Sequence, residues 1–155
     1  MRWAGEYAGV VRDLVGALKF GRRPAAAIPI AVALAPLVPA GVDLVPVPAS
    51  PWRRRLRGFD SAEEIARALG RMTGRSVVDC LRRSSGPRQV GRTRAERLAE
   101  PPRVRIVQSP PGAPLLIDDV FTTGATLAAC ALALGTDVVG ARVFAHGFGP
   151  EAPAA

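Results

Sequence analysis

One segment in the C-terminal third of this 155-residue sequence constrains the fold more than any other part of it. Residues 115–127 have the sequence LLIDDVFTTGATL, in which an apolar run leads to two adjacent acids, a loop of threonine and glycine, and a second apolar run. This order predicts a buried strand, a tight turn and a helix, which together are the repeating unit of open α/β sheets. Ligands of such sheets bind at the carboxyl ends of the strands, so the acids and the loop are candidates for a site.

The turn in this segment has the chemistry of an anion site, because backbone N–H groups at the start of a helix and small hydroxyls bind phosphate. The candidate phosphate-binding residues are Thr122, Thr123, Gly124, Ala125 and Thr126. The adjacent acids, Asp118 and Asp119, suit two neighbouring sugar hydroxyls, with or without a metal ion. The alternative is an ordinary buried strand that ends in a solvated acidic turn. A Walker loop is excluded, because the sequence contains no Gly-Lys-Ser or Gly-Lys-Thr.

Composition limits the class of protein without deciding its function. The length fits one domain over residues 1–155, and the 48% of hydrophobic residues is ordinary for a globular protein. The formal net charge is +8, and Lys19 is the only lysine among the 21 basic residues. This charge suits a diphosphate, a nucleic-acid surface, or simply solvated arginine, and charge alone leaves the three open.

The two cysteines, Cys80 and Cys130, are far apart in the sequence and indicate neither a zinc ribbon nor a disulfide framework. Cys130 is expected in the core. We expect a cytoplasmic protein, since no signal peptide is recognisable. The apolar stretch 24–48 contains several prolines and Asp43, so we interpret it as a buried helix and a strand and expect no membrane span.

The spacing of apolar residues and the positions of glycine and proline predict an alternation of strands and helices. Strands are expected over 42–47, 76–81, 104–107, 115–120 and 138–145. Helices are expected over about 5–20, 25–37, 61–72, 93–98 and 125–134. Ser61 has capping-box spacing to Glu64, and Gly135 can end the last helix. Residues 82–103 are polar and are expected to include a mobile loop, and the tail 149–155 is expected to fray. The fold class is therefore α/β, a mostly parallel sheet flanked by helices.

A second block of chemistry follows the strand predicted at 42–47. The residues VPVP at 45–48 lead into a basic loop, 53–58, which contains Arg53, Arg54, Arg55 and Arg57. Guanidinium groups bind phosphate oxygens in pairs, so this loop is a candidate for a diphosphate. A solvent-facing basic loop and a nucleic-acid contact are the alternatives.

The two blocks together resemble a known family. A hydrophobic strand, two acids and a Thr/Gly-rich loop form the phosphoribosyl-diphosphate (PRPP) motif of the type I phosphoribosyltransferases. The order VPVP, Arg57-Gly58-Phe59, Gln89-Val90-Gly91-Arg92 and Glu96-Arg97, followed by this motif, resembles the ComF family of competence-associated predicted phosphoribosyltransferases. Residues 18–20, Leu-Lys-Phe, also fit that family. The resemblance covers about residues 7–147.

The resemblance implies a type I phosphoribosyltransferase fold that uses Mg²⁺ and PRPP and transfers phosphoribosyl to a nitrogen acceptor. It assigns the ribose hydroxyls to Asp118 and Asp119, either of which could also contact Mg²⁺. The 5′-phosphate is assigned to the Thr122–Thr126 loop. The candidates for the diphosphate are Arg53, Arg57, Arg88 and Arg92.

The sequence also departs from the family. The cysteine-rich zinc ribbon with which the family usually begins is not present, and the usual Asn-Gln after Arg-Gly-Phe is Asp60-Ser61 here. The Asn that usually follows Glu-Arg after two residues is replaced by Glu100. Any contact made by those amides in the family is lost or changed in this chain.

Three hypotheses follow: an Mg²⁺-dependent phosphoribosyltransferase, a PRPP sensor without turnover, and an accessory protein for DNA uptake or repair. In the third, the arginines face single-stranded DNA or a partner in the DNA-uptake machinery. Purine-base members often carry Asp at the position of Thr122, which cannot serve as a base near neutral pH, so a neutral amine is favoured as acceptor. The single histidine, His146, is expected to be structural or exposed.

Overall fold

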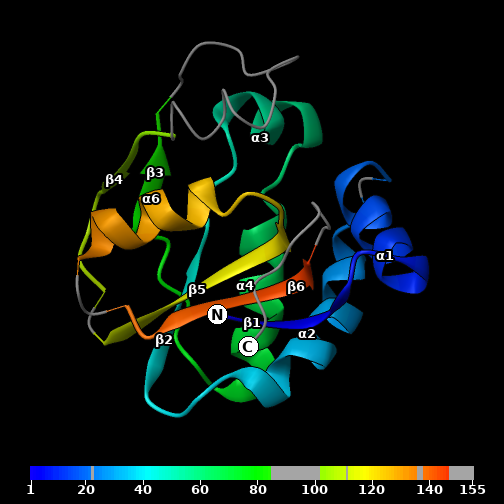
Figure 1. Cartoon of the computed structure of the whole chain (residues 1–155), viewed down its shortest axis with the longest axis horizontal. Helices are drawn as coiled ribbons and strands as arrows, with labels where there is room; N and C mark the ends of the chain where they lie inside the picture. The colour runs from blue at the N-terminus through cyan, green and yellow to red at the C-terminus, as the bar shows by residue number, and fades with distance from the viewer. Residues whose placement is uncertain (22, 85–101, 111, 136–137, 147–155) are drawn as a thin grey trace.

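The computed structural model describes residues 1–21, 23–84, 102–110, 112–135 and 138–146. Its centre is a four-stranded sheet in the order β1-β6-β5-β2, in which all neighbouring strands are parallel (Figure 1). The strands are β1 (Arg2–Glu6), β2 (Val42–Pro46), β5 (Ala113–Phe121) and β6 (Gly140–His146). The α/β class and the mostly parallel sheet predicted from the sequence are therefore confirmed.

Strand β5 is the long inner strand, and its register places the acids at an edge of the sheet. Ile117 lies opposite Pro46 of β2, where that strand ends. Phe121 lies opposite His146, the last residue of β6. Because neighbouring parallel strands end together, the turn after β5 and the chain after β2 leave the sheet on the same side.

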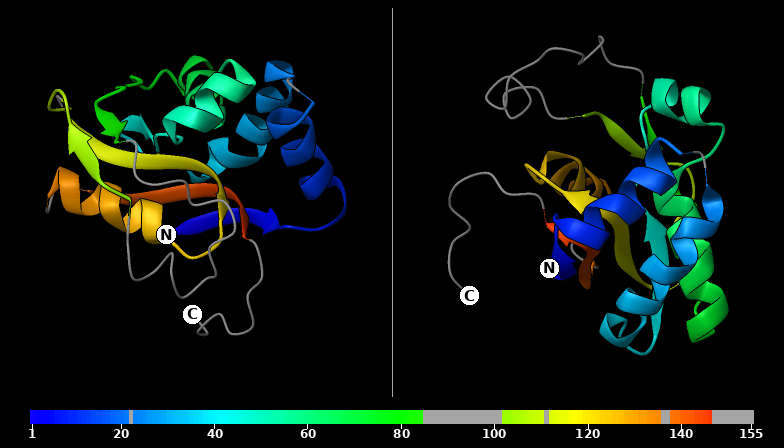
Figure 2. Two further views of the ribbon diagram at one scale, coloured as in Figure 1. Left: turned by 90° about the horizontal axis from the view of Figure 1, so that it is seen from above. Right: turned by 90° about the vertical axis from the view of Figure 1, so that its right-hand side faces the viewer.

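One face of the sheet is covered by three helices, α1 (Gly9–Lys19), α2 (Ala27–Leu34) and α4 (Ser61–Thr73) (Figure 2). Short 3-10 turns, Pro24–Ala26 and Ala35–Leu37, flank α2. The packed side chains include Leu18, Ile30 and Ile65, all fully buried. This larger core fixes α1, which ends beside the carboxyl edge of the sheet.

The opposite face is covered by α6 (Ala125–Leu134) and by a small antiparallel pair, β3 (Leu81–Arg83) with β4 (Val104–Ile106). Leu116 of β5 packs here with Leu127 and with Cys130, which is buried as predicted. Burial raises the pKa of the Cys130 thiol to about 12, so this cysteine is a protonated core residue. No described helix is both long and apolar enough to cross a membrane.

The predicted N-terminal helix is confirmed over Gly9–Lys19, but it begins later than expected and follows a strand that was not predicted. A single helix over about 5–20 was expected, whereas Arg2–Glu6 form β1. Strand β1 pairs with β6 over the whole of its length, from Arg2 opposite Arg142 to Glu6 opposite His146. Its side chains are mostly exposed, so it carries no apolar alternation. Only the hydrogen bonds to a distant partner make it a strand.

The basic loop predicted at 53–58 is also wrong, because residues Pro51–Arg57 form helix α3. Ser50 is its N-cap and accepts a hydrogen bond from the N–H of Arg53 at 3.4 Å. Pro51 occupies the first helical position, and Gly58 ends the helix with a left-handed φ of 84°. All three are ordinary helix signals, which the run of arginines obscured.

Other differences are smaller. The strand expected at 76–81 is a single parallel bridge between Val77 and Leu44, followed by β3. The N-cap of α4 is Asp60, which accepts from the N–H of Ala62, and not the predicted Ser61. The helix expected at 25–37 is divided by its prolines into α2 and the two 3-10 turns. The helix predicted at 125–134 is confirmed to the residue. The helix expected at 93–98 and the tail 149–155 lie outside the described residues.

Candidate functional site

The turn between β5 and α6 forms a small cup at the carboxyl edge of the sheet. A cavity of about 40 Å³ is lined by Asp118 and by residues 120–127. The first hydrogen bond within α6 runs from the N–H of Ala128 to the carbonyl of Gly124, so the preceding N–H groups have no acceptor inside the helix. The N–H of Ala125 has the Thr123 hydroxyl nearby, at 3.4 Å. The cup therefore combines N–H groups, hydroxyls and one carboxylate.

Gly124 is required at the turn for two reasons. Its φ of +73° is left-handed, which disfavours side chains. A Cβ at this position would also lie 2.7 Å from the ring of Phe121, which is too close. The ring of Phe121 stacks in turn on His146 at 5.2 Å between centroids, and His146 contacts Trp3 at 5.0 Å. The three rings from β1, β6 and β5 support the turn, and this packing agrees with the structural role predicted for His146.

The two acids face different surroundings, because adjacent residues of a strand point to opposite faces. Asp118 lines the cup beside α6. Asp119 instead meets α1, where one carboxylate oxygen lies 2.7 Å from the ammonium nitrogen of Lys19. Their side chains are largely buried, with 9% of Asp119 and 19% of Lys19 exposed. Asp118 therefore faces the α6 side of the sheet and Asp119 faces the α1 side, so the two carboxylates do not lie side by side.

Asp118 has an unusual electrostatic position. Burial raises its pKa well above the ordinary value, the neighbouring charge of Asp119 raises it further, and Lys19 opposes the shift. One oxygen of Asp118 accepts the N–H of Asp119 at 2.8 Å. Carboxyl groups with a raised pKa are common at functional sites. Such a group destabilises the fold when it is charged, and it is retained where its position is needed for binding or catalysis.

Basic side chains from distant elements gather around the acids. The pKa of Arg57, on α3, is lowered mainly by burial, while Asp119 raises it and Arg53 lowers it. The pKa of Arg83, on β3, is lowered by burial and by Arg53, with Asp118 acting in the opposite direction. The sequence-predicted Arg57 therefore lies within electrostatic reach of Asp119, whereas Arg53 interacts with Arg57 and Arg83. Arg88 and Arg92 lie outside the described residues.

Asp60 connects the chain after β2 to the helices. Its carboxylate accepts the N–H of Ala49 at 2.7 Å and the N–H of Ala62 at 3.1 Å. Burial raises its pKa, and the two N–H bonds act against that shift. Ser61 receives a weak hydrogen bond from Arg57 at 3.4 Å. Asp60 and Ser61 therefore position the chain between β2 and α4.

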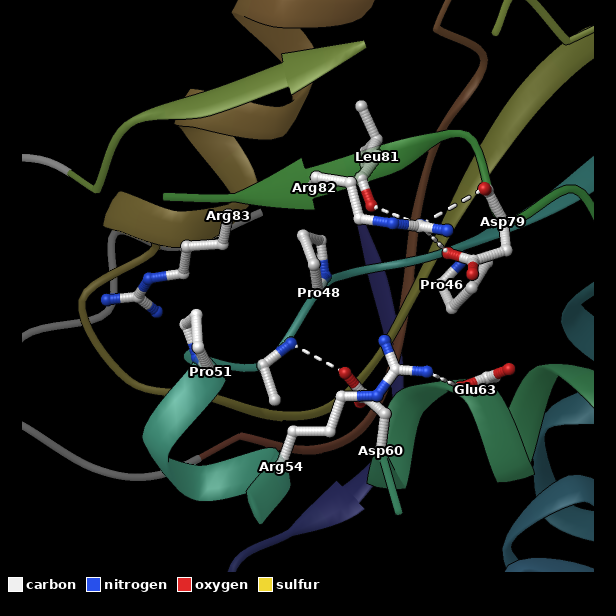
Figure 3. Close-up of a pocket in the computed structure, with 11 residues that line it drawn as sticks. Pro46, Pro48, Pro51, Arg54, Asp60, Glu63, Asp79, Leu81, Arg82 and Arg83 are labelled. Atoms are coloured by element: carbon white, nitrogen blue, oxygen red, sulfur yellow. Dashed lines mark hydrogen bonds and ion pairs between the residues drawn. The ribbon is translucent and has the colours of Figure 1, made fainter. Parts of the chain in front are cut away.

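A second cavity, larger than the cup, lies apart from it. It has a volume of about 150 Å³ and lies between α3, α4 and β3, with Pro46, Pro48 and Leu81 in its wall (Figure 3). Two of its arginines have acidic partners, Arg54 with Glu63 at 3.4 Å and Arg82 with Asp79 at 2.6 Å. With these pairs the wall is nearly balanced in charge, which does not suit a diphosphate.

Three residues near the acids were not among the predicted site residues: Lys19, Asp60 and Arg83. One feature of the sequence could have indicated Lys19 as a site residue: it is the only lysine and lies at the end of an amphipathic helix. No feature of the sequence distinguishes Arg83 from the many other arginines. Only the packing of α1 and β3 on the sheet brings them to the edge.

The described residues do not form a protein-held metal site. No group of three His, Cys, Asp or Glu side chains among them lies close enough to hold an ion. Asp119 is already paired with an ammonium group, and Asp118 accepts a backbone N–H. A hard cation such as Mg²⁺ needs several free oxygen ligands. The described residues therefore do not hold Mg²⁺ without further oxygen ligands from water or from a bound phosphate ligand.

Comparisons with known proteins add no family to this geometry. No protein-family model matches the chain, and no curated protein matches it significantly.

Proposed function

We propose that this chain is a PRPP-binding protein of the ComF type with a type I phosphoribosyltransferase-like fold. Its proposed reaction transfers the phosphoribosyl group to a nitrogen acceptor and releases diphosphate. The observation that carries the proposal is the cup after β5, in which a left-handed glycine, three threonines, the start of α6 and Asp118 converge at the carboxyl edge of a parallel sheet. Such edges are where α/β sheets bind phosphorylated ligands.

Each part of the site has a role in this reaction. The Thr122–Thr126 turn binds the 5′-phosphate through N–H groups and hydroxyls. Asp118 and Asp119 accept hydrogen bonds from ribose hydroxyls. Arg53 and Arg57, with Arg83, supply positive charge to the diphosphate as it leaves. Arg88 and Arg92 remain candidates for the same role. Mg²⁺ belongs to the proposal only as a partner of the diphosphate.

The chemistry itself needs little from the protein beyond binding and charge. The bond from C1 of ribose to the diphosphate oxygen breaks, and its electrons leave with the diphosphate. A nitrogen lone pair forms the new bond to C1, and the proton on that nitrogen passes to solvent. Asp118 is the only carboxylate among the described residues that line the cup, and Thr122 cannot remove a proton near neutral pH. An amine that is already neutral is therefore the proposed acceptor class.

Calorimetry with PRPP and Mg²⁺ tests the proposal, comparing the wild type with Asp118→Asn/Asp119→Asn. The wild type should bind with a dissociation constant below about 1 mM and the double variant at least about tenfold more weakly. Asp13→Asn is the matched control, because Asp13 is an exposed acid of α1 whose side chain is 74% accessible. Undetectable binding by the wild type at millimolar PRPP would refute the proposal.

Turnover is tested separately. Diphosphate release over a panel of amines and nucleobases distinguishes an enzyme from a PRPP sensor. Release that depends on one acceptor class and disappears in Asp118→Asn supports transfer. Tight PRPP binding with no release for any acceptor supports the sensor.

One observation favours a second candidate, in which the chain binds single-stranded DNA as an accessory protein for DNA uptake or repair. On α3, Trp52 is 53% exposed beside exposed Arg53, Arg54 and Arg55. An aromatic surface among cations is the chemistry of single-strand binding. Salt-dependent binding of an oligonucleotide that is lost in Trp52→Ala, with PRPP binding unchanged, would support it. Equal binding by the wild type and Trp52→Ala would remove the reason for it.

A further inference from the structure

Lys19, the last residue of α1, forms an ion pair with Asp119 of β5. The ammonium nitrogen lies 2.7 Å from the carboxylate, and both side chains are largely shielded from water. Ion pairs on the surface are weak because water screens them, whereas a shielded pair is strongly coupled and its separation leaves a buried charge. The ion pair is therefore expected to persist and to determine the charge around Asp119.

The ammonium group is held in place by the end of its helix. Lys19 is the last residue of α1, where the helix dipole favours a cation. The next residue, Phe20, lies under the guanidinium of Arg57 at 5.8 Å. Leu18 on the other side is fully buried in the core. The backbone on both sides of Lys19 is thus tied to the sheet and to α3, so the ammonium is presented to Asp119 at low entropic cost.

A cation is needed at this position. Asp118 and Asp119 are adjacent, with Asp119 buried and Asp118 half-buried, and their charges repel each other. In many proteins a divalent ion neutralises such a pair. Here the ammonium of Lys19 occupies the oxygen of Asp119 that an ion would need, and the described residues offer no further group of metal ligands around it.

We infer that Lys19 is a tethered cation that orients Asp119 toward a ribose hydroxyl and keeps divalent metal ions off the acid pair. Lys19 is thus a positioning residue for the ligand. The inference rests on the proposed function for the identity of the hydroxyl, whereas its metal-binding part concerns the protein without ligand.

The first experiment uses Mn²⁺ alone, followed by electron paramagnetic resonance in a buffer free of phosphate. The wild type and Lys19→Arg should show no bound Mn²⁺ up to about 1 mM, because both keep a cation on Asp119. Lys19→Met should gain one Mn²⁺ site, and Lys19→Met/Asp119→Asn should lose it again. Arg67→Met is the control, since it removes an exposed cation from Glu63 at 2.5 Å without touching the acid pair. A site in the wild type, or no gain in folded Lys19→Met, would overturn the inference.

A second measurement needs no variant, because Lys19 is the only lysine of the chain. Protein labelled with ¹⁵N-lysine has a single side-chain ammonium signal. This signal should keep its chemical shift at about 1 mM Mg²⁺, because a diamagnetic ion that cannot reach Asp119 leaves the ion pair in place. A large change in the shift, or loss of the signal, would place the metal at the acid pair and contradict the inference, even if Lys19→Met failed to fold.

Binding of ribose 5-phosphate tests the positioning role. Lys19→Met should weaken it about tenfold, and Lys19→Arg should restore affinity to within about threefold of wild type. Equal affinity of Lys19→Met and wild type would contradict positioning. If the wild type binds no PRPP, the proposed function fails, while the Mn²⁺ result on Lys19 stands separately.

Discussion

The two segments that reach the acid pair, the β5–α6 turn and the β2–α3 connection, differ in what holds them. The turn is held mostly by its own neighbours: Asp118 accepts from Asp119, Thr123 lies by Ala125, and Phe121 lies against Gly124. Its one distant support is the stacking of Phe121 on His146. The connection is held by distant partners. The N–H of Val47 bonds the carbonyl of Ile117 at 2.9 Å, and the N–H of Ala49 bonds Asp60 across eleven residues.

The two halves of the site are therefore determined in different ways, one by local contacts and the other by tertiary contacts. A turn fixed by local contacts has a recognisable sequence and keeps its geometry when distant residues change. A connection fixed by tertiary contacts has no such sequence signature and should respond to changes in α1 and α4. Four substitutions test this contrast, two at the turn and two at the connection.

The largest expected effect is that of Gly124→Ala, which should break the turn. The left-handed φ and the contact with Phe121 at 2.7 Å together should lower the free energy of unfolding by about 3 kcal/mol and abolish phosphate binding. Gly74→Ala is the matched control, with a φ of +67° but open space around the position, so it should cost only about 1 kcal/mol. Chemical denaturation measures both. Equal losses would show that the Phe121 contact is unimportant.

Arg57→Ala should weaken the second half of the site without unfolding it. Loss of one charged contact to a diphosphate should reduce PRPP affinity about 10- to 100-fold, corresponding to about 1.5–3 kcal/mol. The affinity for ribose 5-phosphate should change little, because that ligand has no diphosphate. Arg12→Ala, which removes an exposed arginine of α1, is the control for net charge. Calorimetry with both ligands would contradict the assignment if their affinities fell equally.

Asp60→Ala should act on the connection through structure. It removes the N-cap of α4 and leaves the N–H of Ala49 without its acceptor, so we expect a loss of about 1–2 kcal/mol in unfolding free energy. Diphosphate affinity should fall with it, whereas the affinity for ribose 5-phosphate should stay within about threefold. Thermal unfolding and calorimetry measure the two effects. An equal loss for both ligands would mean that the connection and the turn are not independent.

The smallest expected change in unfolding free energy is that of Asp118→Asn, and it is an increase in stability. Asp118→Asn should abolish ligand binding and yet stabilise the protein at neutral pH by up to about 1 kcal/mol, or about 2–4 °C in Tm. The pKa of Asp118 is raised in the folded state, mainly by burial, so the folded state binds its proton more tightly than the unfolded state. The protonated Asp118 contributes its full share of the unfolding free energy below pH 3.8, the pKa of the unfolded state. This stability is lost as the pH rises through the raised pKa of the folded state.

The measurement for this variant is the unfolding free energy against pH. The advantage of Asp118→Asn over wild type should grow from about pH 4 upward and then level off. Asp13→Asn, an exposed carboxylate, should show no such trend. A variant that is less stable than wild type at all pH values would show that the Asp118 carboxylate stabilises the fold.

The sequence alone determined the features that depend on neighbouring residues. Segment 115–127 predicted a strand, a turn and a helix in the right places, because apolar runs, a glycine and helix-start residues act over a few positions. The α/β class followed from the alternation of such segments. The signals for α3 were also local, with Ser50, Pro51 and Gly58 in ordinary cap positions, and the run of arginines hid them.

Only the tertiary structure decided the features that depend on distant partners. Strand β1 has no apolar pattern and exists because β6 offers it hydrogen bonds. Asp118 and Asp119 appear as one pair in the sequence, yet the strand turns them to opposite faces, one to the cup and the other to Lys19. The field around an acid depends on charges brought close by packing, and 100 residues separate Lys19 from Asp119 in the chain. The sequence therefore specified the turn, and the fold specified the charges around it.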